Sequence, residues 1–229
     1  MRSTPGAKPM LFKARQTIAL DSIAFNWRAK CGLFGAVSVT DYLSADSCGV
    51  RVRLLGLIPI ATFIDSPAAV KGETMRYLAE LPWAPDAILR NRRLVWQVID
   101  ERTIIVSSRE GAGGGEVTLR LSPDGMVASI EASDRPRIEG DVTIERPWRG
   151  VFSAYRCFEG RTVPTHGEVF WTLPTGAFKA WEGEVTGWAL HKCDTARRSH
   201  SHPAQGQKNV GRDEQRSEDQ LVVLRQPDR

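Results

Sequence analysis

The short motif whose side chains are best suited to metal binding or catalysis is His166-Gly167-Glu168. Residues two apart on a strand point to the same face, so the imidazole and the carboxylate would lie side by side. Glu184 on the next predicted strand adds a third group, and such a set suits a metal ion or acid–base catalysis. The competing interpretation is a strand that starts at the rim of a sheet. Because His166 is the sole nitrogen ligand of this set, we favour the rim and assign no catalytic residue, metal or cofactor.

A second polar group lies in a predicted helix, where Glu73, Arg76 and Glu80 are three and four residues apart. This spacing puts them on one helical face, where they suit surface ion pairs. The alternative is that part of this face lines a pocket. For that case we predict Glu73, Arg76 and Tyr77 as its polar, helix-side residues.

Tryptophan is the most informative residue type in this chain. Indole is large and apolar and carries one hydrogen-bond donor, so it serves both in cores and in pocket walls. The seven indoles are those of Trp27, Trp83, Trp96, Trp148, Trp171, Trp181 and Trp188. Most are expected in the core and two or three on a concave face, with Trp83 and Trp171 predicted to contact a ligand.

The glycine-rich run Gly111-Ala112-Gly113-Gly114-Gly115 resembles a phosphate-binding loop only superficially. The dinucleotide fingerprint needs a third glycine where Glu116 stands, followed by a helix. A strand pattern follows instead. The run is therefore predicted to be a flexible hairpin loop.

The predicted long helix is the element that the other elements must pack around. Ser66 is suited to cap its N-terminus, with Pro67 at the first helical position, and the helix can run to Leu81. Prolines on both sides of Trp83 end it, and a short turn over 86–89 follows. Its predicted apolar stripe comprises Val70, Met75, Tyr77, Leu78 and Leu81.

The remainder of the chain has the alternating pattern of antiparallel strands joined by short turns. The predicted strands lie within 23–31, 37–43, 50–54, 54–64, 94–100, 102–109, 116–122, 126–133, 150–158, 161–173 and 178–191, with a bend or bulge in 54–64. The predicted fold is mainly β (α+β): a strongly curved antiparallel sheet, or half-barrel, with one principal helix packed against it. The domain is expected to span residues 10–191, followed by a disordered polar tail over 192–229.

Composition limits the function classes. The net charge of +4 and the pI near 9.0 are spread along the chain, so no nucleic-acid-binding face is predicted. The four cysteines are widely separated and expected as free thiols, with a Cys31–Cys48 disulfide as the alternative. No signal peptide or membrane span is predicted, which indicates a cytoplasmic protein, or a periplasmic one if the N-terminus is truncated.

Four segments together carry a family resemblance: GETMRYLAELPW (72–83), WQVID (96–100), RPWRGVFSAYRCFEGRTVPTHGEVFWTLPTG (146–176) and GEVTG (183–187). Their order resembles a widespread bacterial and archaeal family of uncharacterised domains, similar to the half-barrels of the lipoprotein-carrier superfamily. The resemblance implies a curved antiparallel sheet with a helix across it, and no reaction. Lys71 stands where the family pattern has an acidic residue.

Three hypotheses follow from the sequence. The leading one is a non-catalytic module that binds a lipid or other apolar ligand on the concave side of its sheet. The first alternative is a hydrolase-like or metal-dependent enzyme that uses His166, Glu168 and Glu184, or the helix face from Glu73 to Tyr77. The second is a structural or interaction domain with a filled core and no ligand. Oligomeric state and ligand identity are not determined by the sequence.

Overall fold

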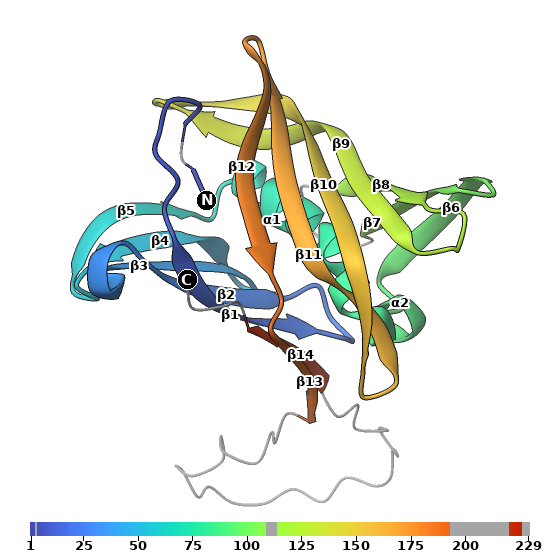
Figure 1. The fold of residues 1–229 in the computed structure, drawn as a ribbon. Coiled ribbons are helices and arrows are strands. Elements are labelled where there is room, and N and C mark those ends of the chain that lie inside the picture. The colour runs from blue at the N-terminus through green and yellow to red at the C-terminus, as the bar shows by residue number, and fades with distance from the viewer. Residues whose placement is uncertain (3, 109–113, 193–219, 226–229) are drawn as a thin grey trace, which may run out of the picture.

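The computed structural model describes residues 1–2, 4–108, 114–192 and 220–225, which form two curved antiparallel sheets with a helical segment between them (Figure 1). The first sheet has the order β13-β14-β1-β2-β3-β4-β5 and the second β12-β11-β10-β9-β8-β7-β6. The predicted mainly β fold with one principal helix is confirmed, and its strands divide between two sheets.

Five strands of the first sheet come from the N-terminal part of the chain and two from the C-terminal part. Its strands are β1 (Phe12–Ala19), β2 (Phe25–Cys31), β3 (Val37–Leu43), β4 (Cys48–Leu54), β5 (Ile58–Ile64), β13 (Gly187–Lys192) and β14 (Gln220–Arg225). A 3₁₀ turn, η1 (Leu33–Gly35), joins β2 to β3. Along β2, Phe25, Trp27, Ala29 and Cys31 are buried and the residues between them are more exposed. One face of this sheet therefore covers the core, as the alternation predicts.

The second sheet is a meander that begins after the helices. Its strands are β6 (Leu94–Asp100), β7 (Thr103–Ser108), β8 (Glu116–Leu121), β9 (Val127–Glu139), β10 (Val142–Phe158), β11 (Arg161–Leu173) and β12 (Gly176–Glu184). The predicted end of β9 at Ser133 is wrong, because the strand continues through Pro136 to Glu139. β10 likewise contains Pro147, at a register shift between Arg146 and Trp148 that accommodates the missing donor.

The predicted single strand 178–191 is also wrong. The chain leaves the second sheet after Glu184 and enters the first sheet at Gly187, so this segment supplies β12 to one sheet and β13 to the other. Between them, the Val185 backbone N–H donates to Thr165 O at 2.8 Å. The alternation of apolar residues continues where the chain changes sheet, so the sequence pattern does not reveal the change.

The helical segment forms as the sequence predicts. α1 (Pro67–Ala79) begins after Ser66, whose Oγ accepts from the Ala69 N–H at 3.1 Å. A 3₁₀ turn, η2 (Leu81–Trp83), and a short helix, α2 (Pro85–Arg90), follow. α1 contacts β3 and β4 of the first sheet and β7, β8 and β9 of the second. It is therefore enclosed from both sides, and its apolar stripe is only part of its buried surface.

Lys71 fixes α1 to the second sheet. Its Nζ lies 2.5 Å from Asp134 Oδ2 on β9 and 2.7 Å from Glu145 Oε1 on β10. The glycine-rich loop adds a second contact: its residues 109–113 lie outside the described part, but a Cβ on Gly115 would be 2.8 Å from Met75 Cγ. β7 and β8 pair as the predicted hairpin, and the close approach of Gly115 to α1 requires a residue without a side chain.

Several further predictions concern the ends of the chain. Gln220–Arg225 forms β14 between β13 and β1, so disorder was wrongly predicted for these residues; 193–219 and 226–229 lie outside the described ranges. The expected domain start at residue 10 omits Arg2, whose N–H donates to Ala180 O at 2.7 Å. Cys31 and Cys48 are free and buried, and Cys157 is free and exposed. None of the described helices has the length and apolar character needed to cross a membrane.

Trp83 joins the helical segment to both sheets. Its indole Nε1–H donates to Pro164 O on β11 at 2.9 Å, and its own carbonyl accepts from Trp188 Nε1 on β13 at 2.8 Å. The ring packs edge-on against Phe152 at 5.1 Å between centroids. A buried indole with these contacts leaves a large cavity when it is truncated.

We therefore expect Trp83→Ala to lower the free energy of unfolding by roughly 3–5 kcal/mol. The half-buried His166 is the comparison, because its replacement by alanine should cost only about 0.5 kcal/mol. Thermal unfolding of the two variants checks this. Equal shifts of the unfolding midpoint, or a larger shift for His166→Ala, would contradict the position assigned to Trp83.

Candidate functional site: a cavity between the sheets

A cavity of about 300 Å³ lies between the two sheets and beside α1. The first sheet and the helical segment contribute Gln16, Trp27, Asp41, Arg76, Ala79, Glu80 and Trp83. The second sheet and the ends of the chain around it contribute Met1, Arg2, Arg135, Trp148, Gly150, Phe152, Glu168, Val169, Trp171, Ala180, Trp181 and Val185. Five of the seven tryptophans are in this lining, more than the two or three expected from the sequence.

The aromatic part of the wall is built from both sheets. Phe12 of β1 lies 6.0 Å from Trp27 and 6.1 Å from Trp181 between ring centroids, and so bridges the first and second sheets. Trp83 lies 6.3 Å from Trp181 in an edge-to-face arrangement. Such tilted pairs are the favoured geometry of aromatic rings, so the indoles hold one another in place.

Two glycines make room for these rings. A Cβ on Gly150 would lie 3.2 Å from Trp148 Cη2, and a Cβ on Gly167 would lie 3.1 Å from Trp83 Cζ2 and 3.2 Å from Trp181 Cζ3. Both distances are tighter than ordinary contacts. In the motif His166-Gly167-Glu168, the glycine thus leaves room for the indoles, and Glu168 itself lines the cavity.

Charged residues form the other part of the wall, centred on Arg76 of α1. Its guanidinium donates through Nη1 to Asp41 Oδ2 on β3, and through Nε to Glu80 Oε1 at 2.9 Å. The Gln16 amide on β1 donates to the other oxygen of Glu80. The same guanidinium stacks on Phe25 at 4.9 Å and Trp27 at 5.3 Å. Two nitrogens of Arg76, Nη1 and Nε, are therefore paired with carboxylates.

Burial and pairing compete in this group. Burial disfavours the charge of Arg76, but the carboxylates of Asp41 and Glu80 outweigh it and raise the pKa of Arg76 above its usual value. Burial raises the pKa of Glu80, against the opposing effect of Arg76. The pairing of Arg76 with Glu80 favours the charged form of each group and so offsets part of the free-energy cost of burying it.

Arg135 of β9 is another guanidinium in the wall, and it differs from Arg76. It stacks on Trp148 at 4.6 Å and on Trp171 at 5.6 Å. Burial lowers its pKa, although Glu73, Asp41 and Glu80 are near enough to counteract part of this effect. Within the described ranges it has no hydrogen-bond or ion-pair partner. Arg135 therefore lines the cavity without an acceptor from the described residues.

Glu73 lies behind this wall. Burial and the neighbouring Asp41 carboxylate raise the pKa of Glu73 well above its usual value. Glu73 Oε2 and Asp41 Oδ1 are both inaccessible and lack a donor. A proton on Glu73, donated to Asp41, satisfies both oxygens, because two adjacent buried carboxylates do not both ionise.

The predicted ligand-binding residues divide into two groups. Arg76, Trp83 and Trp171 line the cavity, whereas Glu73 and Tyr77 do not. Tyr77 is fully buried, and its hydroxyl donates to Ala19 O at 3.0 Å and accepts from Asn91 Nδ2 at 2.8 Å. Burial raises the pKa of Tyr77. The helix is buried on several faces, so helical spacing alone does not identify the face on the cavity.

The sequence analysis missed several lining residues, of which Arg135 and Asp41 matter most. Asp41 occupies an inward position of β3, among the apolar residues Val37, Val39 and Leu43. A charged residue at a position where the alternation predicts an apolar one indicates a buried polar site, and this can be recognised from the sequence. Arg135 lies beyond Ser133, where the predicted strand ends, whereas β9 continues to Glu139. No local signal identifies its role, which depends on the register of β9.

The alternative site at His166 takes a different form from the predicted one. His166 and Glu168 are joined by Glu182, with ligand atoms within 4.8 Å of one another, rather than by Glu184. Lys179 Nζ lies 2.8 Å from Glu168 Oε1 and 2.8 Å from Glu182 Oε2, so a side-chain cation already neutralises the carboxylates. This arrangement is a network of ion pairs across β11 and β12, in which His166 is the sole nitrogen ligand.

Comparison with known proteins identifies a family without a known activity. The model of a family of unknown function (DUF6544) matches residues 1–183. Among solved structures, a LolA superfamily protein from Nitrosomonas europaea is similar at 12% identity and a TM-score of 0.31, over 73% of this chain and 80% of that chain. No match is found among the curated proteins. The predicted uncharacterised family is confirmed.

The raised pKa of Glu73 predicts a pH-dependent stability. The folded state holds this proton more tightly than the unfolded chain, where the pKa is about 4.5, so the contribution is fully present below that pH and is lost as pH rises through the folded pKa. Glu73→Gln keeps a donor to Asp41 and removes the titration. We expect it to raise the unfolding midpoint at neutral pH, by about 2–4 °C per kcal/mol gained, and to flatten its dependence on pH.

Thermal unfolding between pH 4 and pH 8 measures this effect, with the exposed Glu116→Gln as the matched control. The control should follow the unsubstituted protein at every pH. A Glu73→Gln variant that is destabilised at neutral pH would show that Glu73 is ionised in the folded protein, and would rule out the shared proton.

Proposed function

The chain belongs to the family of unknown function DUF6544, and we propose that it binds an amphipathic anion in the cavity between its sheets, without transforming it. The apolar body of the ligand lies among the indoles and its anionic end lies on Arg135. The observation that supports this most directly is Arg135 itself: a cavity-lining guanidinium stacked on two indoles, with no acceptor from the described residues.

The indoles account for the apolar part of the proposed ligand. Trp27, Trp171 and Trp181 come from three strands and surround one space. Burying apolar ligand surface against them contributes about 25 cal/mol per Å². The cavity volume, about 300 Å³, is at the lower end of the roughly 300–1,000 Å³ of small-molecule sites. A single short or medium acyl chain suits this size better than a whole phospholipid.

The arginines account for the polarity of the ligand. Arg76 has its charge matched by Asp41 and Glu80, so it orders the wall and has little left to offer an anion. Arg135 keeps its planar donor fork available, and this fork matches a carboxylate with two parallel hydrogen bonds. A charge-assisted bond in a site with little water is stronger than a neutral one. A carboxylate head is therefore preferred over a hydroxyl head.

The same contacts favour binding over catalysis. The lining carboxylates Asp41 and Glu80 are held by Arg76 and Gln16. The third lining carboxylate, Glu168, is paired with Lys179. Glu73 lies behind the wall. A general base needs an accessible lone pair within hydrogen-bond distance of its substrate. These groups are arranged to satisfy one another, so we assign them a structural role.

The proposal predicts a preference for anionic chains that depends on Arg135. Titration with decanoate should change tryptophan emission in a saturable way, because the ligand enters among five indoles. Arg135→Gln should weaken decanoate binding by about 10- to 100-fold, the loss expected for a hydrogen bond to a charged group, and should leave decan-1-ol binding unchanged. Trp171→Leu should weaken the binding of decanoate and of decan-1-ol to the same extent.

The matched control is Arg137→Gln. Arg137 lies two residues along the same strand and also stacks on Trp171, at 5.1 Å, but it does not line the cavity and is paired with Glu139 at 3.4 Å. The Arg137→Gln variant should bind decanoate as the unsubstituted protein does. Absence of a saturable signal, in protein shown by mass to be free of ligand, would sink the binding proposal; decanoate binding that is indifferent to Arg135→Gln would reject the anion site.

A further inference from the structure

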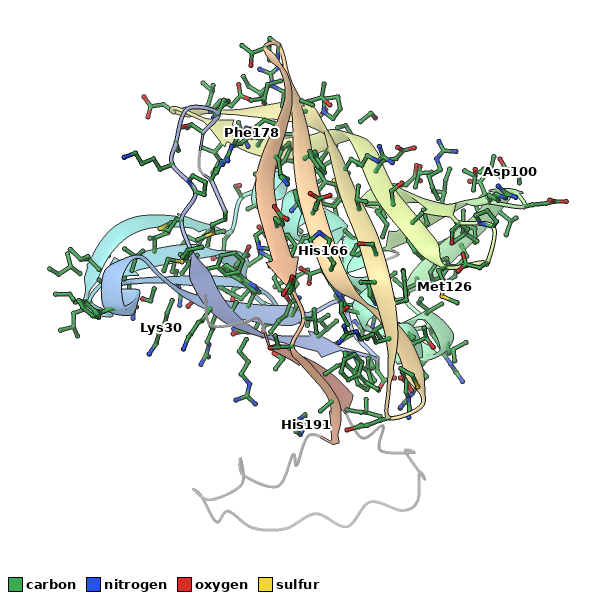
Figure 2. All side chains as sticks on the ribbon, viewed as in Figure 1. Lys30, Asp100, Met126, His166, Phe178 and His191 are labelled. Atoms are coloured by element: carbon green, nitrogen blue, oxygen red, sulfur yellow. The ribbon has the colours of Figure 1, made fainter. Side chains whose placement is uncertain are left out.

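The outward face of the first sheet carries a group of cations that the linear charge distribution does not reveal. Each of three strands contributes two basic residues at a spacing of two, and a strand turns such residues to one side. This basic face consists of Lys13 and Arg15 on β1, Arg28 and Lys30 on β2, and Arg51 and Arg53 on β4. All six are exposed, and Figure 2 shows Lys30 pointing away from the second sheet.

The strand register brings these cations together. Lys13 is directly opposite Lys30, and Arg15 is opposite Arg28. Ser38 and Thr40 of β3 lie between the basic residues of β2 and those of β4. At the other described positions of the same phase on β1 to β4, the residues are Thr17, Ala19, Asn26, Tyr42 and Gly49, none of them acidic. Arg15 directly opposite Arg28 places two like charges side by side, which destabilises a sheet and which an external anion would offset.

An apolar tip adjoins the basic face. It is formed where η1 meets the turn between β4 and β5, which are joined by a hydrogen bond from Leu55 N to Ala36 O at 2.6 Å. Its members are Phe34, Leu55, Leu57 and Ile58, exposed by 97%, 68%, 83% and 57%. It touches the basic face at two points, since Arg53 is two residues before Leu55 and a Cβ on Gly35 would lie 3.3 Å from Lys30 Cβ.

The backbone of the tip supports a functional interpretation. Phe34 and Leu55 have positive φ values of 54° and 53°, a conformation that bulky apolar residues rarely adopt. Strained backbone of this kind persists where the surrounding structure imposes it, and it gathers at functional sites. Here it directs two apolar side chains into solvent at the end of a cationic sheet.

We propose that this side of the molecule docks on an anionic lipid bilayer. The basic face meets the charged headgroups, and the tip inserts its apolar side chains at the boundary between headgroups and acyl chains. Juxtaposed cations and exposed aromatic and aliphatic residues are the two elements of peripheral membrane binding. A nucleic acid would be met by the cations alone and would leave the tip without a partner. Membrane docking involves only the basic face and the apolar tip, and it is independent of the ligand proposed for the cavity.

Vesicle sedimentation tests the docking. The full chain is mixed with vesicles of phosphatidylcholine alone and with vesicles that contain one third phosphatidylglycerol. Binding is expected only to the anionic vesicles and should weaken with salt. Replacing Arg28, Lys30, Arg51 and Arg53 together by glutamine should lower the partition coefficient by about 100-fold or more, from the attraction of each cation to an anionic surface.

The tip is tested separately with Phe34→Asn, Leu55→Asn and Leu57→Asn combined. Asparagine tolerates positive φ, so the triple variant removes apolar surface without adding strain. Binding to anionic vesicles should fall by at least about tenfold and keep its salt dependence. Matched controls are the exposed cations Arg92, Arg102 and Arg156 changed to glutamine, and Leu89→Asn on α2, all of which should bind normally.

Circular dichroism confirms that each variant is folded before its binding is measured. Equal binding to neutral and anionic vesicles, or no binding to either, would overturn the proposal. So would binding that neither set of substitutions weakens. Fluorescence anisotropy with a double-stranded DNA gives the remaining outcome: DNA binding that is lost in the glutamine variant and kept in the tip variant, without vesicle binding, would replace the membrane by a nucleic acid.

Discussion

A charged arginine held between two sheets is the constraint on which the interior of this protein depends. Arg76 is carried there by α1, which contacts both sheets, and leaving its charge without a partner in that position would cost about 3–5 kcal/mol. Asp41 on β3 and Glu80 at the end of the helix supply the partners, and Gln16 on β1 holds Glu80 in place. The helix is thereby locked to the first sheet, while Lys71 locks it to the second.

The cavity follows from this arrangement. The charged cluster occupies the space beside the helix and prevents the sheets from closing over it with apolar side chains, so the indoles of both sheets meet around a void instead. Gly150 and Gly167 provide the clearance that the rings need. Because Asp41 and Glu80 are already paired with Arg76, Arg135 remains as a cation with capacity for a ligand. The pairing of one arginine thus leaves the other available.

The sequence predicts the local structure well and the long-range register poorly. Ser66, Pro67 and the prolines around Trp83 determine where the helices start and stop, and these are local interactions. The position of Tyr77 depends on which side of α1 meets each sheet, and the partner of Glu168 depends on a register that places Glu182 directly opposite it. The basic face was overlooked for the same reason, because its pairs are distant in sequence and become neighbours only when β1, β2 and β4 align.

The central claim is that one ligand chain lies among the indoles with its head on Arg135. A crystal structure of the protein with decanoate brominated at the far end of the chain tests it directly, because anomalous scattering locates the bromine. The account predicts bromine density between Trp27, Trp171 and Trp181, with the carboxylate within hydrogen-bond distance of the Arg135 guanidinium. Bromine found only on the outer surface, or a carboxylate that points away from Arg135, would contradict it.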